Sequence, residues 1–219
     1  MLEGTRHMKL MKVRLTFLEP VLGMSAADPE IHEHYIASKA GDAPKIEEEV
    51  AAIGVDGVVE RGMTIFPKLE DGTPFMWDYQ VKGFFKDACG MLRRVTGSKS
   101  AAQRSYKKVI DGLIFPQPRK IPFVLPKDGE ITTLQRPLRA STPQGERITL
   151  ANSEMIPAGT KMTFVIEIWQ DDLKPFIEEC LTYGSRRGMG QWRNASFGRF
   201  RWEELDKNGK VIGGNLDSD

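Results

Sequence analysis

The chain has 219 residues, of which 40% are hydrophobic and 28% charged, with a formal net charge of +1, which excludes a chain that is disordered throughout. The apolar runs are far shorter than the roughly 20 residues of a membrane span, and the N-terminus lacks the pattern of a signal peptide, so we expect a cytoplasmic protein without a membrane partner. Cys89 and Cys180 are too few and too far apart for a disulfide framework or a zinc site.

The acidic and basic residues are segregated along the chain. No acid lies between Asp87 and Asp111, and none lies from Cys180 to Trp202, while acids are concentrated in 28–60 and after 203. Such windows can form a basic face that attracts a polyanion. The alternative is that the two windows lie on different faces and are simply solvated.

The N-terminal region predicts one strand and one long insertion. We interpret residues 1–11 as a leader that is not native to the protein, followed by a half-buried strand over 12–18, where apolar and polar residues alternate. Residues 20–72 are acidic and rich in glycine and proline, with a short helical pattern at 46–53, so we expect an insertion there.

Asp78 is a candidate N-cap for an amphipathic helix that extends to Val95, because apolar residues recur at three- and four-residue spacing after it. Lys82, Lys86 and Arg93 fall on the opposite arc of this helix and form a basic stripe. Either phosphate groups or water can contact that stripe.

The second half of the chain predicts a proline-rich middle, a strand, a helix and a last strand. Prolines break residues 107–150 into short apolar runs typical of edge strands and loops rather than helix. Residues 161–169 alternate as a strand, and a second helix is expected from Asp171 or Asp172 to Gly184. The last strand is expected over 197–203, within a single domain that ends at 205 and precedes a polar tail at 206–219.

Taken in order, these elements give β, insertion, α, β, β, α, β. This is the α+β, ferredoxin-like (RRM-type) arrangement, in which two helices cover one face of an antiparallel sheet. The opposite face is then free to carry a ligand, as in RNA-recognition domains.

The segment between the second helix and the last strand combines glycines, arginines and a tryptophan. Glycine lets a backbone adopt positive φ and approach a ligand, arginine forms charge-assisted hydrogen bonds to phosphate, and tryptophan can stack on an unpaired base. The residues that predict RNA binding here are Gly188, Gly190, Gly198, Arg186, Arg187, Arg193, Arg199 and Trp192. The alternative is a flexible surface loop with Trp192 in the core. A loop that follows a helix and precedes a strand is the reverse of a Rossmann turn, and no P-loop is present, so we expect no nucleotide cofactor.

This run, RRGMGQWRNASFGRF, resembles the glycine-rich loop of the RAMP superfamily, the repeat-associated RNA-binding proteins of CRISPR systems. Residues 72–94, with Lys82-Gly83 at the start of a helix, resemble the second signature of that family, and 20–23 resemble the first turn of the backbone subunits of CRISPR effector complexes. The resemblance implies a ferredoxin-like protein that binds single-stranded RNA, such as a CRISPR guide RNA, together with other subunits or copies of itself. Residues 77–80 depart from the Pro-Gly-Ser-Ser that this family usually carries before Lys-Gly.

Two alternative functions remain open. An endoribonuclease would use His32 and His34 as a general acid–base pair, or Asp28 in the segment after the first strand. No further histidine or cysteine lies near His32 and His34 in sequence, so we expect no metal. The other alternative is a mobile-element protein that acts on a CRISPR complex through the acidic insertion. We favour binding over cleavage.

Overall fold

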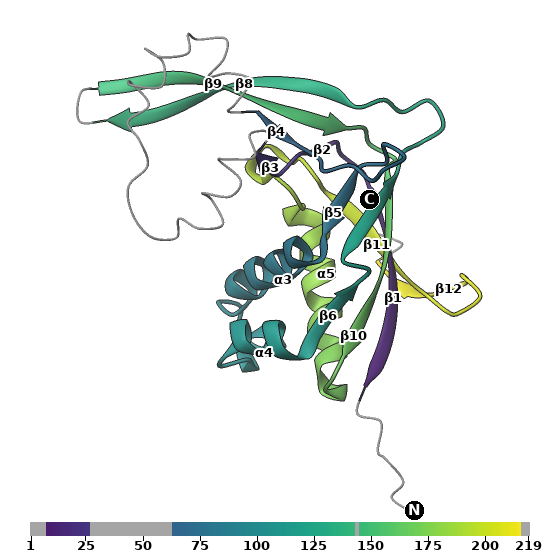
Figure 1. The fold of residues 1–219 in the computed structure, drawn as a ribbon. Helices are drawn as coiled ribbons and strands as arrows, with labels where there is room; N and C mark the ends of the chain where they lie inside the picture. Colours follow the sequence, from purple (N-terminus) through teal and green to yellow (C-terminus); the bar gives the residue numbers. More distant parts are fainter. Residues whose placement is uncertain (1–7, 27–62, 143–144, 216–219) are drawn as a thin grey trace, which may run out of the picture.

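The computed structural model describes residues 8–26, 63–142 and 145–215, which form two sheets and a layer of helices (Figure 1). Within these residues the main sheet has seven strands in the order β12-β11-β1-β10-β7-β5, and β6 also pairs with β10. Every strand pair in it is antiparallel. The strands are β1 (Lys9–Phe17), β5 (Phe75–Trp77), β6 (Ile114–Gln117), β7 (Lys120–Val124), β10 (Lys161–Ile168), β11 (Phe200–Leu205) and β12 (Val211–Gly214).

The second sheet is built around a long hairpin. Within the described residues its strands are β2 (Val21–Leu22), β3 (Ser25–Ala26), β4 (Thr64–Ile65), β8 (Thr132–Thr142) and β9 (Gly145–Ile156). β8 pairs with β9 along its whole length, and the other strands follow in the order β2-β9-β4-β3. Figure 1 shows the hairpin extending across one end of the main sheet, next to β2 and β3.

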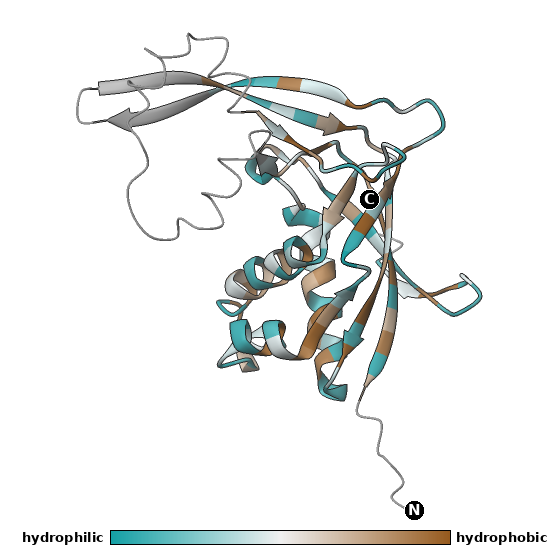
Figure 2. Ribbon diagram, viewed as in Figure 1, coloured by the Kyte–Doolittle hydropathy of each residue, from teal (hydrophilic) through white to brown (hydrophobic). Residues whose placement is uncertain are grey.

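The helices cover one face of the main sheet (Figure 1). They are α3 (Asp78–Leu92), α4 (Tyr106–Leu113) and α5 (Lys174–Arg187), with 3₁₀ turns at Ser100–Ala102, Asp171–Leu173 and Arg193–Ala195. In Figure 2 the polar residues of α3 and α4 lie mainly on their outer surfaces, as expected for amphipathic helices on a sheet. None of the described helices is long and apolar enough to cross a membrane.

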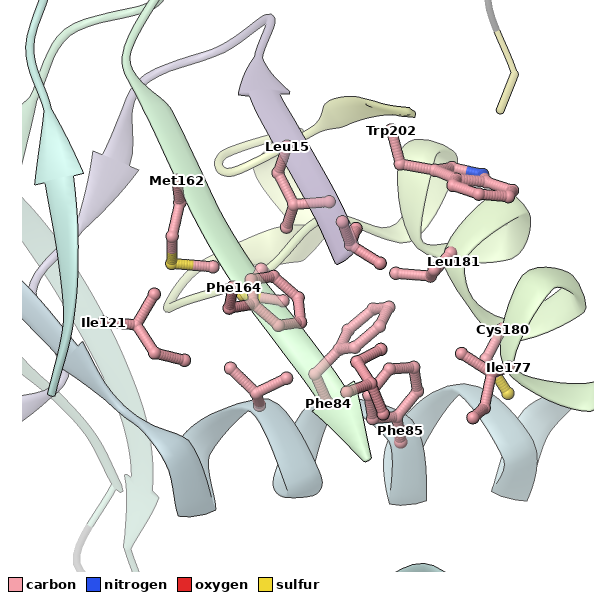
Figure 3. Packing of buried hydrophobic residues seen from close by; sticks show 14 of the residues in the cluster. Leu15, Phe84, Phe85, Ile121, Met162, Phe164, Ile177, Cys180, Leu181 and Trp202 are labelled. Atoms are coloured by element: carbon pink, nitrogen blue, oxygen red, sulfur yellow. The ribbon is translucent and has the colours of Figure 1, made fainter. Parts of the chain in front are cut away.

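A single hydrophobic core fills the space between the helices and the sheet. Alternate residues of β1 and β10 point into it because successive side chains of a strand face opposite ways. Figure 3 shows Phe84 and Phe85 of α3 in this core with Phe164 of β10 and Ile177 of α5. Burying each of these side chains contributes about 1.5–3 kcal/mol, so this layer supplies much of the stability of the fold.

The N-terminus of α3 lies one residue earlier than expected. Trp77 is the N-cap and Asp78 the first helical residue. The Trp77 amide donates to Gln80 Oε1 at 3.0 Å. This bond gives an acceptor to an amide at the helix start that has no carbonyl partner within the helix. α3 ends at Leu92, and Val95 is exposed beyond it rather than part of the apolar stripe.

The second helix continues past Gly184, so its expected end was wrong. A Cβ on Gly184 would lie 2.3 Å from Phe84 Cζ and 2.8 Å from Phe200 Cζ, so this glycine allows α5 to pack closely on α3 and β11. The helix ends at Arg187, and the φ of its C-cap Gly188 is 80°, a positive value that favours glycine. Arg186 and Arg187 therefore lie in the last helical turn, not in the loop.

Three elements differ from the expectations. The proline-rich middle contains helix α4, whose residue Ile110 is buried in the core. β1 begins at Lys9 and buries Met11, so this strand starts three residues before the expected 12–18. After β11, a turn at 206–210 leads into β12, which pairs with β11. The helical pattern at 46–53 lies outside the described residues.

Candidate nucleic-acid interface

The segment from Gly188 to Gly198, called here the glycine loop, is closed at its base. The Met189 amide donates to the Gly198 carbonyl at 2.9 Å, and Met189 is buried. A Cβ on Gly198 would lie 1.8 Å from the Met189 carbonyl oxygen, and one on Gly188 would lie 2.4 Å from the Phe197 carbonyl oxygen. Only glycine fits where the two ends of the loop cross this closely.

The glycine loop also packs against β2. The Gly198 amide donates to the Pro20 carbonyl at 2.8 Å, and a Cβ on Gly190 would lie 3.1 Å from Val21 Cγ1. The amides of Gly188 and Gly198 are therefore used inside the protein and are not available to an anion. The amides of residues 190–194 have no acceptor in the described part of the chain, so these can face a ligand.

Arg187 and Arg193 converge on one carboxylate of α3. Arg193 Nη1 lies 2.5 Å from Asp87 Oδ2, and Arg187 Nε lies 3.4 Å from the same oxygen. The second contact is an ion pair without hydrogen-bond geometry, since Arg187 Nε is a buried donor with no hydrogen-bond partner. Arg187 Nη1 instead donates to Asn194 Oδ1 at 2.9 Å. Asp87 thus neutralises one of the two guanidinium charges and positions both.

Trp192 lies at the tip of the glycine loop with a left-handed φ of 52°. Its ring stacks on that of Phe197, with centroids 5.2 Å apart and an interplanar angle of 14°. The side chain is still 41% exposed, so part of the ring surface can contact an unpaired base. The alternative of a tryptophan inside the core is therefore excluded.

Arg136 of β8 completes this site, and sequence reasoning missed it. Its guanidinium lies 5.0 Å from the Trp192 ring centroid, and its Nη2 donates to Gln191 Oε1 at 2.9 Å. The residue is 8% exposed, and its Nε and Nη1 have no hydrogen-bond partner in the structure. Burial lowers the pKa of Arg136 from its ordinary value. No pattern in the sequence marks this arginine, because its position depends on the pairing of the hairpin with the loop.

The remaining arginines of the segment differ in exposure. Arg186 is exposed at the end of α5, and its side chain forms no hydrogen bond or ion pair with another described residue. Arg199 is half-buried, its Nε lacks a hydrogen-bond partner, and its carbonyl accepts from the Leu18 amide at 2.8 Å. Counting Arg136, the glycine loop is bordered by more guanidinium groups than carboxylates, which favours an anionic ligand.

The predicted basic stripe of α3 contacts α4 and β6 rather than water alone. Lys82 Nζ donates to the Asp111 carbonyl at 3.1 Å and lies 4.2 Å from the Phe115 ring centroid. Lys86 Nζ lies 2.6 Å from Asp111 Oδ1. Burial is the main cause that lowers the pKa of Lys82. These contacts pair part of the charge of the stripe within the protein.

Arg93 lies just beyond the C-terminus of α3. Its guanidinium carbon is 5.2 Å from the Tyr106 ring centroid, and the residue is exposed. This contact joins α3 to α4 and leaves the charge accessible to solvent.

Comparison with known proteins identifies a similar fold. A chain of the Type III-B Cmr-beta complex bound to cognate target RNA superposes with a TM-score of 0.52 and 10% sequence identity, covering 95% of this chain and 60% of that chain. The similarity is one of fold. A chain of a Type IV-B CRISPR complex aligns with a TM-score of 0.46 and 12% identity, covering 96% of this chain and 95% of that one. No protein-family model matches the sequence, and no curated protein sequence matches it.

The candidate catalytic residues His32, His34 and Asp28 lie outside the described residues, so nuclease chemistry stays a prediction from sequence. Among residues 8–26, 63–142 and 145–215, no group of three or more histidine, cysteine, aspartate or glutamate side chains is placed to hold a metal ion.

Proposed function

We propose that this protein binds single-stranded RNA as a subunit of a CRISPR-type ribonucleoprotein complex, with the glycine loop on the phosphate backbone. The observation that carries this proposal is the set of buried guanidinium donors around the loop, on Arg136, Arg187 and Arg199, that have no hydrogen-bond partner in the described part of the chain. A buried donor without a partner costs about 1–3 kcal/mol. Phosphate oxygens would satisfy such donors, and the amides of residues 190–194 can add to the same contact.

The strand order supports the finer assignment to a ferredoxin-like domain of the RAMP superfamily. β11, β1, β10 and β6 are neighbours, α3 precedes β6 in the chain, and α5 connects β10 to β11. A split βαβ arrangement has this order, with the first and third strands at the centre. The fold shared with a chain of an RNA-bound Type III-B complex is in keeping with this assignment.

The partners that fit this role are a single-stranded RNA, such as a guide RNA, and other subunits or further copies of this chain. The hairpin β8–β9 supports the second part, because it extends beyond the main sheet while contributing Arg136 to the loop (Figure 1). A strand pair that both projects from the domain and touches the candidate RNA site can contact a neighbouring subunit on the same RNA. A cytoplasmic location follows from this role.

Fluorescence anisotropy with a labelled mixed-sequence single-stranded RNA tests the proposal. If four to six phosphates are neutralised, log K should fall with log salt at a slope of about −3 to −4. Arg193→Gln and Arg187→Gln should each reduce the magnitude of that slope by about 0.7, because each removes one phosphate contact. Asp87→Asn should increase it, because the carboxylate that neutralises part of their charge is lost.

Lys210→Gln is the matched control, since this exposed residue lies in the β11–β12 turn and carries the same charge. It should leave the slope within about 0.2 of wild type. Absence of RNA binding by the wild-type protein at low salt, or equal effects of Lys210→Gln and Arg193→Gln, would contradict the proposal.

A further inference from the structure

Aromatic and basic side chains meet at the edge of the main sheet formed by β5 and β7. In this pair Trp77 lies opposite Lys120, and Met76 lies opposite Ile121. Met76 and Ile121 belong to the hydrophobic core under the helices. Because side chains alternate along a strand, Phe75, Trp77 and Lys120 lie on the other face, away from the helices.

The rings and charges of this cluster have defined mutual geometry. Phe75 and Trp77 meet edge to face, with centroids 4.8 Å apart, and Trp77 lies nearly parallel to Tyr79 at 6.2 Å and 16°. Lys120 Nζ lies 5.6 Å from the Phe75 ring centroid and 5.9 Å from that of Trp77. The Arg119 guanidinium lies 5.5 Å from the Trp77 centroid. Two exposed cations are thus held beside one indole ring.

The residues of this cluster differ in exposure: one ring is buried, and the other side chains are accessible to a ligand. Phe75 is 2% exposed and lies outside the core cluster, so it serves as a floor beneath Trp77. Trp77 is half-buried, Tyr79 is 49% exposed, and Arg119 and Lys120 are exposed. A buried ring such as Phe75 explains only packing at the sheet edge. The two accessible rings beside two cations resemble the aromatic and basic grooves that bind single-stranded nucleic acid.

The backbone around the cluster fixes its shape. The Asp78 amide donates to the Arg119 carbonyl at 2.9 Å, and this bond ties the start of α3 to the β6–β7 turn. Asp78 is the acidic neighbour of the two cations, and its Oδ1 accepts from the Tyr79 amide at 2.8 Å. The carboxylate is therefore engaged at the helix N-terminus, where the helix dipole stabilises it.

We infer that Trp77 and Tyr79 form a stacking site for an unpaired base of single-stranded RNA, and that Arg119 and Lys120 contact the phosphates beside that base. This inference rests on the proposed function and adds a second contact to it. Trp77 lies ten residues before Asp87 on α3, which corresponds to about 15 Å along the helix. One RNA strand can therefore reach both this site and the arginines at the glycine loop.

Binding of intact and abasic RNA to matched variants tests the site. Tyr79→Ala and Trp77→Ala should each weaken binding of mixed-sequence single-stranded RNA by about tenfold, the loss typical of one stacked base. The matched control is Trp169→Ala, because Trp169 is also exposed, at 50%, and lies outside both sites. That control should bind within about twofold of wild type. Thermal denaturation identifies any variant that fails to fold, and Tyr79→Ala, the more exposed position, then decides.

RNA with abasic nucleotides separates stacking from charge. It should bind wild type more weakly than intact RNA does, and this loss should be about tenfold smaller in Trp77→Ala, because the variant has already lost the stacking contact at this site while Trp192 is unchanged. If Trp77→Ala and Tyr79→Ala bind intact RNA like wild type while Arg193→Gln still lowers the salt slope, this inference is wrong and the proposed function stands. If wild type does not bind RNA, the proposed function fails and this site with it.

Discussion

Between the helices and the main sheet, Phe84, Phe85 and Ile177 pack in a cluster of apolar side chains, whereas around the glycine loop Arg136, Arg187 and Arg199 each bury a donor that lacks a hydrogen-bond partner among the described residues. Native proteins satisfy most buried polar groups, and the exceptions cluster where something else binds. The difference separates two roles within one chain. The core stabilises the fold, and the loop region retains donors that an anion can satisfy.

The largest effect should come from the core. Phe85→Ala removes a fully buried ring and should lower the free energy of unfolding by about 3–5 kcal/mol, because lost burial and the cavity left behind both destabilise the fold. Urea denaturation followed by circular dichroism measures it. Val95→Ala, at an exposed position, is the control and should change stability by less than about 0.5 kcal/mol. Equal changes in the free energy of unfolding for the two variants would contradict a core role for Phe85.

The next effect should come from the closure of the glycine loop. Gly198→Ala forces a Cβ against the Met189 carbonyl at a φ of 72°, and should cost about 1–3 kcal/mol of stability while also weakening RNA binding. Gly83→Ala is the matched control, since nothing lies within 4 Å of a Cβ there and the site is a helix interior. It should stabilise the protein by about 0.5–1 kcal/mol. Urea denaturation and RNA anisotropy measure the stability and the RNA affinity of both variants. If Gly198→Ala matched Gly83→Ala in both, the close crossing of the loop ends would be contradicted.

The smallest effect at neutral pH concerns the two thiols of the core. Burial raises the pKa of Cys180 and that of Cys89, so both stay protonated in the folded protein under alkaline conditions that ionise them in the unfolded chain. The stabilisation that comes from keeping both thiols protonated should be complete below about pH 8.5, the ordinary thiol pKa. The free energy of unfolding should fall as pH rises above that value. Urea denaturation from pH 7 to pH 10 measures this slope. Cys180→Ala should make it shallower, and an unchanged slope would contradict burial of the thiol.

Much of the central fold is predictable from the sequence, because its apolar residues recur at regular strand or helix spacing. Residues 161–168 alternate without a break, and the apolar spacing after Asp78 fits one helical face, so the strand and the helix were both expected with nearly correct ends. Helix α4 was missed although Tyr106, Val109, Ile110 and Leu113 have helical spacing, because the prolines that follow indicated strands.

The rest depends on contacts between distant segments. Gly184 has the sequence signature of a helix end, and only its packing against Phe84 and Phe200 explains why the helix continues. The sequence predicts Arg187 and Arg193 as RNA-binding residues, and that stays a prediction, but it indicates neither Asp87 as their shared partner nor Arg136 as a neighbour of the loop. Their positions follow from how α3 and the β8–β9 hairpin meet the loop, which no local pattern encodes.

Closure of the glycine loop by the Met189–Gly198 hydrogen bond divides its residues into a fixed base and a tip. Positions 188 and 198 cannot accept a side chain without moving the backbone, whereas 191–196 project from a segment whose ends are already fixed. Mutation can therefore remodel the tip around Trp192 without disturbing the base. Surface loops on a rigid support tolerate such changes, because the backbone that carries them is positioned by contacts elsewhere.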